Sequence, residues 1–319
     1  MGSKSTVFLF SGQGSQYYQM GQQLFEQNEN FRSWMVTLDQ VAQRILNESI
    51  LNKIYDDKEK GLAFDRTLYT HPAIFMVEYA LARTLITEGI MPDVVLGCSL
   101  GEFAAATIAG VIHMEEALEL VIHQALLFER KCEPGSMLAV LHEIPLLHEI
   151  QAKYPMIEPV AVNYDAHFVV SGSKGDIHAL YTDLKNKNIL CDPLPVSFAF
   201  HSSLINEIAN DYKKMLQKKN FLSPNIPMMS SVDGNFVNKL SDDYFWQVVR
   251  KPIQFAKALQ PLDRVSHRHY IDCGPGGTLA NFTRRNIKSD ATCHAIVTPF
   301  NQEINNLSRI SEWYASINL

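Results

Sequence analysis

The sequence predicts an α/β fold, in which a mostly parallel sheet is covered by helices and carries a smaller antiparallel unit. Short apolar runs alternate with longer helix-forming stretches, and this rhythm is typical of such a sheet. In the middle of the chain the order of elements changes, which indicates an insertion. The chain has 319 residues, of which 46% are hydrophobic and 19% charged, so it can bury a large core.

The first part of the chain contains strands followed by helices. The run TVFLF at 6–10 predicts a buried strand, and the glycines after it predict a turn. A long helix is expected over 72–87, because proline is tolerated in a first turn and Gly89 follows as a stop. The elements expected next are a strand at 93–96, an alanine-rich helix at 100–109 and an amphipathic helix at 114–130.

Residues 137–196 follow the order strand, helix, strand, strand, helix, strand, which ends on the run ILCDPLPV at 189–196. This βαββαβ order is that of a ferredoxin-like unit. We therefore expect a ferredoxin-like subdomain at 132–198, inserted into a large domain made of 1–131 and 199–319. The α/β rhythm resumes after this insertion, with another strand, turn and helix at 269–285.

Composition excludes several functions. The net charge of −6 argues against a nucleic-acid partner, because phosphate binding needs concentrated Lys and Arg. No apolar run approaches the roughly 18 residues of a membrane span, and the N-terminus lacks the layout of a signal peptide. The five cysteines are scattered and form no close pair suited to a metal or a redox motif. We expect a cytoplasmic protein without a metal or other bound cofactor.

One motif predicts a reactive serine. Residues 97–101, GCSLG, fit the pattern G-x-S-x-G, in which a serine projects from a sharp turn between a strand and a helix. The expected elements on either side supply that context. The alternative is that Ser99 only caps the following helix, as serine often does.

A serine nucleophile needs a base, and histidine is the usual one. The chain has eleven histidines. Of these, His201 stands out, because it follows the apolar run FAF and lies where the chain returns from the insertion to the large domain. Position alone does not decide its role, since many histidines are structural or exposed.

Five segments together resemble the malonyl-CoA:acyl-carrier-protein transacylases and the acyltransferases of polyketide synthases. They are FLFSGQGSQYYQMG (8–21), GCSLGEFAAA (97–106), FAFHSSL (198–204), KPIQFAKAL (251–259) and DCGPGGTL (272–279). The resemblance spans nearly the whole chain. It implies an α/β-hydrolase-like large domain with a ferredoxin-like insert, in agreement with the order of elements.

The resemblance also implies roles for individual residues. Ser99 would attack a thioester carbonyl to form an acyl-serine, and His201 would take its proton. The backbone carbonyl of Gln254 would orient the imidazole, and the amides of Gln13 and Leu100 would hold the oxyanion. The substrate would bring its own phosphopantetheine or coenzyme A, so no separate cofactor is implied.

Two departures from the family concern the acyl pocket, which Phe198 and Phe200 are also expected to line. Cys98 stands where family members commonly have histidine, which changes the lining of the pocket. Malonyl-loading members carry an arginine that clamps the free carboxylate, but the matching position is Gln124. Glutamine offers only a neutral donor, so an uncharged acyl group is expected. Arg130 lies six residues further on, on another face of the helix, and is poorly placed to compensate.

Loss of the carboxylate clamp favours a particular branch of the family. Free-standing acyl hydrolases of polyketide synthases that lack built-in acyltransferases remove unwanted acyl groups from carrier proteins, and the resemblance is closest to these. The first expectation is therefore a trans-acting hydrolase of acyl carrier protein in polyketide (antibiotic) biosynthesis. The alternatives are an acyl-CoA:carrier-protein transacylase, malonyl-loading or other, and a non-catalytic module that binds a carrier protein. No membrane partner is expected.

Overall fold

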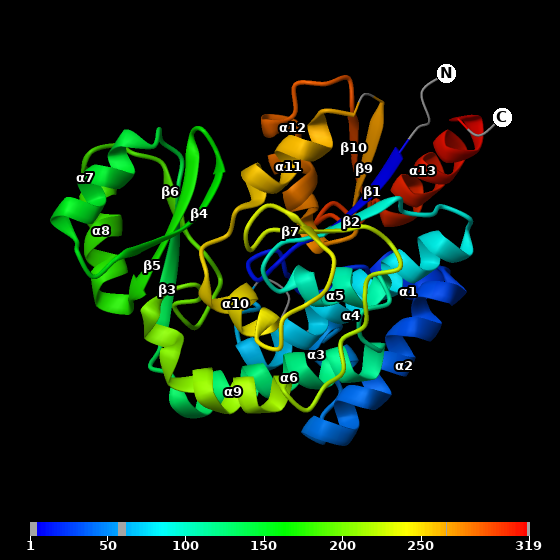
Figure 1. Ribbon diagram of the computed structural model, residues 1–319, viewed down its shortest axis with the longest axis horizontal. Helices are drawn as coiled ribbons and strands as arrows, with labels where there is room; N and C mark the ends of the chain where they lie inside the picture. The colour runs from blue at the N-terminus through cyan, green and yellow to red at the C-terminus, as the bar shows by residue number, and fades with distance from the viewer. Residues whose placement is uncertain (1–4, 57–61, 266, 318–319) are drawn as a thin grey trace.

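A six-stranded sheet forms the centre of the large domain in the computed structural model, which describes residues 5–56, 62–265 and 267–317. All neighbouring strands are parallel except the last pair, β7 and β8. In spatial order the strands are β10 (Thr292–Ala295), β9 (Arg268–Asp272), β1 (Ser5–Phe10), β2 (Val94–Gly97), β7 (Met228–Ser230) and β8 (Phe236–Val237). Figure 1 shows β1, β2, β9 and β10 lying side by side.

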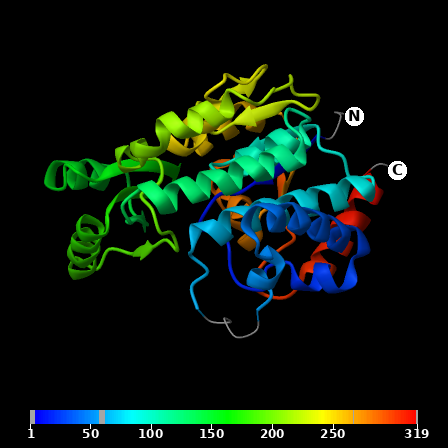
Figure 2. The ribbon, with the colours of Figure 1, turned by 90° about the horizontal axis from the view of Figure 1, so that it is seen from below.

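Helices cover both faces of this sheet, because successive side chains of β1 alternate between two cores. Phe8 and Phe10 belong to one core and Val7 and Leu9 to the other. The first face is covered by α2 (Glu29–Leu46), α4 (Thr67–Thr87), α5 (Gly101–Ile108) and α6 (Met114–Lys131). The second face is covered by α11 (Phe255–Asp263) and α12 (Thr278–Asn286). Figure 2, seen from below, shows α2, α4 and α6 running alongside one another in front of the sheet. The predicted α/β architecture is confirmed.

The inserted unit is a four-stranded antiparallel sheet, seen on the left of Figure 1. Its elements follow the predicted βαββαβ order: β3 (Gly135–Val140), α7 (Pro145–Lys153), β4 (Glu158–Tyr164), β5 (His167–Ser173), α8 (Lys174–Asn186) and β6 (Cys191–Pro193). The strand order β4-β5-β3-β6 is ferredoxin-like. Helices α7 and α8 pack on one face of this sheet around their own core. All these elements lie within the expected 132–198, while the exact domain boundaries stay a prediction.

An isolated β-bridge links the insert to the segment of the large domain that precedes α11. Ala161 of β4 pairs in parallel with Ile253, whose amide donates to the carbonyl of Val160 at 2.7 Å. The segment just before α11 is therefore held by both domains.

Two expected elements have different bounds in the structure. Helix α4 begins at Thr67, so Pro72 lies inside it and not in its first turn. Nearly all of α4 is buried, and this packing outweighs the single hydrogen bond that proline cannot donate. The last strand of the insert shrinks to Cys191–Pro193 instead of 189–196, because Pro193 and Pro195 have no amide to donate to a sheet.

The remaining elements are short, apart from the last helix. They are α1 (Gln22–Gln27), α3 (Ile50–Ile54), η2 (Ser203–Ile208), α9 (Ala209–Leu216), α10 (Tyr244–Arg250), η3 (Pro275–Gly277) and α13 (Glu303–Ile317). Within the described residues, no helix is long and apolar enough to cross a membrane. Nor does any group of His, Cys, Asp and Glu in that part of the chain have an arrangement suited to a metal.

Candidate active site

Ser99 lies on the sharp turn between β2 and α5 that the GCSLG motif predicts. Its φ of 54° is in the left-handed region, which is uncommon for a residue with a side chain. The glycines on either side permit this turn. A Cβ on Gly97 would lie 2.4 Å from Glu102 Cα, and one on Gly101 would lie 2.1 Å from the carbonyl oxygen of Phe10. Any side chain at these two positions would push the turn off the sheet.

His201 faces this serine across the site. Its Nε2 lies 2.8 Å from Ser99 Oγ, although the two residues are 102 positions apart in the chain. His201 is 2% exposed, and its backbone is fixed by a hydrogen bond from its amide to the carbonyl of Val249 at 3.0 Å. Burial lowers the pKa of this imidazole to about 4. The ring is therefore uncharged at neutral pH and can accept a proton from the hydroxyl.

The carbonyl that orients the imidazole belongs to Lys251, and this corrects the expectation for Gln254. His201 Nδ1 donates to the carbonyl oxygen of Lys251 at 2.8 Å, which leaves Nε2 free to accept from Ser99. Gln254 is the N-cap of α11, so its carbonyl is already used by the amide of Ala258 at 2.9 Å. Its amide donates to Ser231 at 2.6 Å, so Gln254 instead anchors the segment that carries Lys251.

Neither Asp165 nor Asp272 orients the imidazole of His201. Asp165 is exposed in the turn between β4 and β5. Asp272 is fully buried, but it accepts from the amides of Gly274 and Ala280, both at 2.9 Å. It thus holds the turn before α12 and does not contact the imidazole.

The two amides expected to hold an oxyanion lie close to Ser99. A Cβ on Gly12 would be 2.8 Å from Ser99 Cβ and 3.4 Å from the amide nitrogen of Leu100, so the loop before Gln13 runs alongside the serine. Among the described residues, neither Gln13 nor Leu100 donates its backbone amide to a protein acceptor. Both amides are therefore free for a substrate oxygen, although their role stays a prediction.

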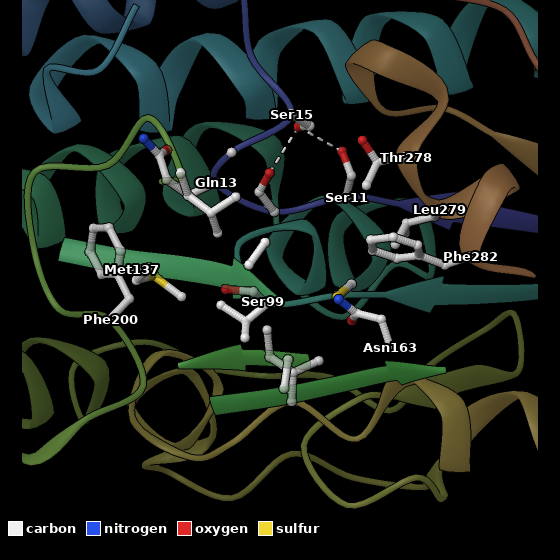
Figure 3. Close-up of a pocket in the computed structure, with 18 of the residues that line it drawn as sticks. Ser11, Gln13, Ser15, Ser99, Met137, Asn163, Phe200, Thr278, Leu279 and Phe282 are labelled. Atoms are coloured by element: carbon white, nitrogen blue, oxygen red, sulfur yellow. Dashed lines mark hydrogen bonds between the residues drawn. The ribbon is translucent and has the colours of Figure 1, made fainter. Parts of the chain in front are cut away.

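Ser99 lines two cavities. The larger, of about 130 Å³, lies between the domains and is lined by His201 and Cys98, by strands of the insert and by loops and α12 of the large domain. Figure 3 shows Ser99 below the loop that carries Ser11, Gln13 and Ser15, and above the strands of the insert. The smaller, of about 10 Å³, shares Ser99 with the larger one but does not have His201 in its lining. Its lining residues are Gln13, His71, Ser99, Leu100, Phe103, Gln124, Phe200, Val248 and Val249.

The residues expected in the acyl pocket divide between these cavities. Gln124 lines the smaller cavity, Cys98 the larger, and Phe200 both. Phe198 lines neither of them; its ring packs 5.7 Å from that of Phe128, behind Phe200. Burial raises the pKa of the Cys98 thiol well above its usual range, which argues against a nucleophilic role. Arg130 is exposed near the end of α6 and does not compensate for the missing arginine.

Sequence reasoning missed Glu102, a fully buried carboxyl three residues after Ser99. It accepts hydrogen bonds from the amide of Ser231 at 2.6 Å and from the hydroxyl of Tyr244 at 2.8 Å. Tyr244 starts α10, whose C-cap is Lys251, and Ser231 binds the amide of Gln254. Glu102 therefore connects the serine turn to both ends of the segment that supports His201. Burial raises its pKa to about 7.

A second buried carboxyl, Glu78 of α4, was also missed. Its Oε1 accepts from the amide of Ser11 at 2.5 Å and from the Ser11 hydroxyl at 3.0 Å. Ser11 Oγ also lies 2.9 Å from Ser15 Oγ, and Ser15 donates to the carbonyl of Gly12 at 2.8 Å. This chain of bonds fixes the loop that brings Gln13 beside Ser99. Burial holds the pKa of Glu78 well above its usual range, and the charge of Asp272 adds to this effect.

Comparison with known proteins shows the family to which the chain belongs. A family model described as "Acyl transferase domain" matches residues 7–317. The chain belongs to the acyl transferase domain family. "Polyketide biosynthesis acyltransferase homolog PksD" of Bacillus subtilis is 44% identical over 307 residues, 95% of each chain. "Polyketide biosynthesis acyltransferase homolog BaeD" of Bacillus velezensis is 43% identical over 309 residues, 96% of this chain and 95% of the relative.

A solved structure shares the acyl transferase fold over its full length. The malonyl CoA-acyl carrier protein transacylase from Clostridium perfringens is 25% identical, covers 99% of this chain and 100% of its own, and superposes with a TM-score of 0.82. The family resemblance expected from the five segments is thus confirmed, as is an acyltransferase-family enzyme with a large α/β domain and a small insert.

Proposed function

We propose that this protein hydrolyses acyl thioesters of acyl carrier protein, through an acyl-Ser99 intermediate, as a trans-acting editing enzyme of polyketide biosynthesis. The observation that carries the proposal is the line of hydrogen bonds from Ser99 through His201 to the Lys251 carbonyl. It is the arrangement that an activated serine nucleophile needs. The names of the two Bacillus relatives support the pathway.

The reaction proceeds in two halves. In the first, Ser99 Oγ attacks the thioester carbon while His201 Nε2 takes the hydroxyl proton, and the amides of Gln13 and Leu100 stabilise the negative oxygen. The C–S bond then breaks, the pantetheine sulfur takes the proton from His201, and the acyl group stays on Ser99. In the second half water loses a proton to His201 and attacks the ester. The C–O bond to Ser99 breaks, Ser99 recovers its proton, and a free acid leaves.

The presence of glutamine at position 124 is evidence that the acyl group is uncharged. Gln124 is 1% exposed in the smaller cavity, where family members that load malonyl have an arginine. A carboxylate placed there would be buried without a counter-charge, which costs several kcal/mol. Malonyl groups are therefore disfavoured by about a hundredfold or more.

A second candidate is transfer of the acyl group from coenzyme A to a carrier protein. The transacylase from Clostridium perfringens, which matches the whole chain, favours it. The first half-reaction is identical, and a carrier thiol takes the place of water in the second. The third candidate, a carrier-binding module without catalysis, is opposed by the close contact of Ser99 with a neutral imidazole.

The test is to incubate the protein with acetyl-, butyryl- and malonyl-loaded carrier protein, and to follow free acid and the mass of the intact chain. Release of acetate or butyrate with little malonate supports the hydrolase. A lasting acyl-enzyme that passes its acyl group to a fresh carrier supports the transacylase. Ser99→Ala should abolish the mass increase, and His201→Ala should slow acylation by at least about a hundredfold. If none of the three substrates gives an acyl-enzyme, the non-catalytic carrier-binding module is the candidate that remains.

A further inference from the structure

The smaller cavity beside Ser99 contains two buried polar side chains that lack partners. Gln124 and His71 are 1% and 2% exposed. Gln124 Nε2 and His71 Nδ1 make no hydrogen bond of good geometry among the described residues, and the Tyr212 hydroxyl, which interacts with the Gln124 side chain, makes none either. Unpaired polar atoms this deeply buried are uncommon in native proteins and call for a ligand or a trapped water. Together with Gln13, Gln124 and His71 are the polar side chains that line a cavity otherwise walled by apolar groups and Ser99.

The positions of the two cavities show which end of the substrate each would receive, given the proposed function. His201 lines the larger cavity and is not part of the lining of the smaller one. Since His201 gives its proton to the leaving sulfur, that sulfur lies on the side of the larger cavity. The acyl chain, on the opposite side of the carbonyl carbon, then points into the smaller cavity, towards Gln124 and His71.

Size and charge restrict the acyl groups that fit. The smaller cavity of about 10 Å³ has room for about one water-sized group, so a long hydrocarbon chain would have to displace its walls. No Lys or Arg lines it, so a carboxylate would have no counter-charge. Burial lowers the pKa of His71 to about 3, and its ring is therefore uncharged at neutral pH.

We propose that the preferred acyl group is short and uncharged and carries a hydroxyl or keto oxygen on its second or third carbon. That oxygen accepts a hydrogen bond from Gln124 Nε2 and lies beside the His71 ring. An aliphatic acyl group of the same size offers neither side chain an atom to pair with. Sites built to pair a buried polar group discriminate strongly against analogues that lack the matching atom.

Matched pairs of substrates test this inference directly. In glycolyl and propionyl thioesters of pantetheine a hydroxyl replaces a methyl group, and 3-hydroxypropionyl and butyryl thioesters form a second such pair. We would measure kcat/KM for all four. Because a hydroxyl group also changes the reactivity of the thioester itself, each hydroxyacyl-to-acyl ratio is divided by the same ratio measured with Gln124→Met, which keeps the length of the side chain.

The expected result is a corrected ratio of about ten or more in at least one pair. Ratios near one, or below one, in both pairs would overturn the inference. If Gln124→Met does not fold, as judged by thermal melting, His71→Phe replaces it as the reference, since phenylalanine keeps a ring and removes the nitrogens.

The proposed function and this inference can fail separately. Mass spectrometry of the intact chain reports acyl-Ser99 for each thioester. Absence of acyl-Ser99 with all four would overturn both. Acyl-Ser99 that forms with the same hydroxyacyl-to-acyl ratio in the wild type and in Gln124→Met would overturn only the preference for an oxygen.

Discussion

A backbone carbonyl supports the candidate base, where many serine enzymes use a carboxylate. The Lys251 carbonyl fixes the His201 ring by a 2.8 Å bond, but it carries no full negative charge to stabilise an imidazolium. Burial then dominates the electrostatics, and the pKa of His201 falls to about 4. With an uncharged carbonyl as its partner, the His201 imidazole stays neutral and able to accept a proton over a wide range of pH.

The pH dependence of acylation should reflect this low pKa. Only the neutral imidazole accepts the Ser99 proton, so we expect kcat/KM for a small thioester to stay constant from about pH 8 to pH 5. It should fall about tenfold per pH unit below the His201 pKa of about 4. Rates of acyl-Ser99 formation from quenched reactions provide the measurement, with circular dichroism at each pH as the control for folding. An inflection at or above pH 6.5, the ordinary value for histidine, would contradict this assignment.

At the residue level, the sequence predicted some parts of the site and not others. Ser99 and His201 could be predicted because serine and histidine are reactive residue types. Each also lies in a recognisable sequence pattern. Lys251 could not be predicted, since every residue has a carbonyl and only the fold decides which one meets the ring. The same holds for His71, whose importance comes from lining the same cavity as Gln124.

At the level of elements, the turn from β2 to α5 depends on close packing of backbone against backbone. The neighbour of Gly101 is the carbonyl of Phe10 on β1, which cannot move without disturbing the central sheet. Glycine at this position is therefore a requirement of the packing.

Gly101→Ala should be strongly destabilising for this reason. A Cβ 2.1 Å from a backbone oxygen forces a shift of the helix, and we expect a loss of about 3 kcal/mol or more of unfolding free energy. Gly175→Ala in α8 is the matched control, because the nearest atom to its Cβ would be Ser173 Oγ at 3.9 Å. That change should be neutral or stabilise by up to about 1 kcal/mol. Urea unfolding of both variants measures the difference; equal effects would refute the packing argument.

Helix α10 and the segment after it are held in place by Glu102. Replacing this carboxyl with leucine leaves Ser231 and Tyr244 without their shared acceptor, so the Lys251 carbonyl loses its fixed position. We expect Glu102→Leu to lower kcat by about tenfold or more in protein that still folds, with a smaller change in KM. Glu102→Gln keeps an acceptor oxygen and should recover most of the rate. A glutamine variant as slow as the leucine variant would show that the charge, and not the position, matters.

At the scale of the whole molecule, buried groups of opposite type titrate in opposite directions. Burial lowers the pKa of His71 and of His201, and raises that of Glu78, Glu102 and Asp272. Acidification therefore weakens the fold through the histidines and strengthens it through the carboxyls. The net pH dependence of stability is the difference between two larger contributions.

Glu102→Gln isolates one of these contributions. The pKa of Glu102 is about 7 in the folded chain, against an ordinary value of 4.5, so between these pH values the folded chain binds one more proton than the unfolded chain. Wild-type stability therefore declines through this group as pH rises from 4.5 to 7 and is constant above it. Relative to wild type, the variant should gain about 3 kcal/mol between pH 4.5 and pH 8. Urea unfolding of both proteins across this range tests it; a constant difference would exclude a raised pKa.

The architecture was largely predictable because periodicity and element order carry it. The alternation of strands and helices and the βαββαβ order of the insert both gave the observed sheets. The start of α4 was missed, because the burial of that whole helix is a property of the folded molecule and outweighs the local signal of Pro72. The bridge between Ala161 and Ile253 joins residues 92 apart, and no local pattern indicates it.

Placing His201 on the larger cavity alone has a kinetic consequence for the proposed reaction. Water and a thiol must reach the acyl-serine through the same opening, so they compete for one position. The time for which a carrier arm stays in that opening after the first half-reaction then sets the ratio of hydrolysis to transfer. Free pantetheine added in increasing amounts should divert the acyl group from the acid to the thioester in proportion to its concentration. The same polypeptide would thus act as a hydrolase or as a transferase, depending on whether water or a thiol occupies the opening for longer.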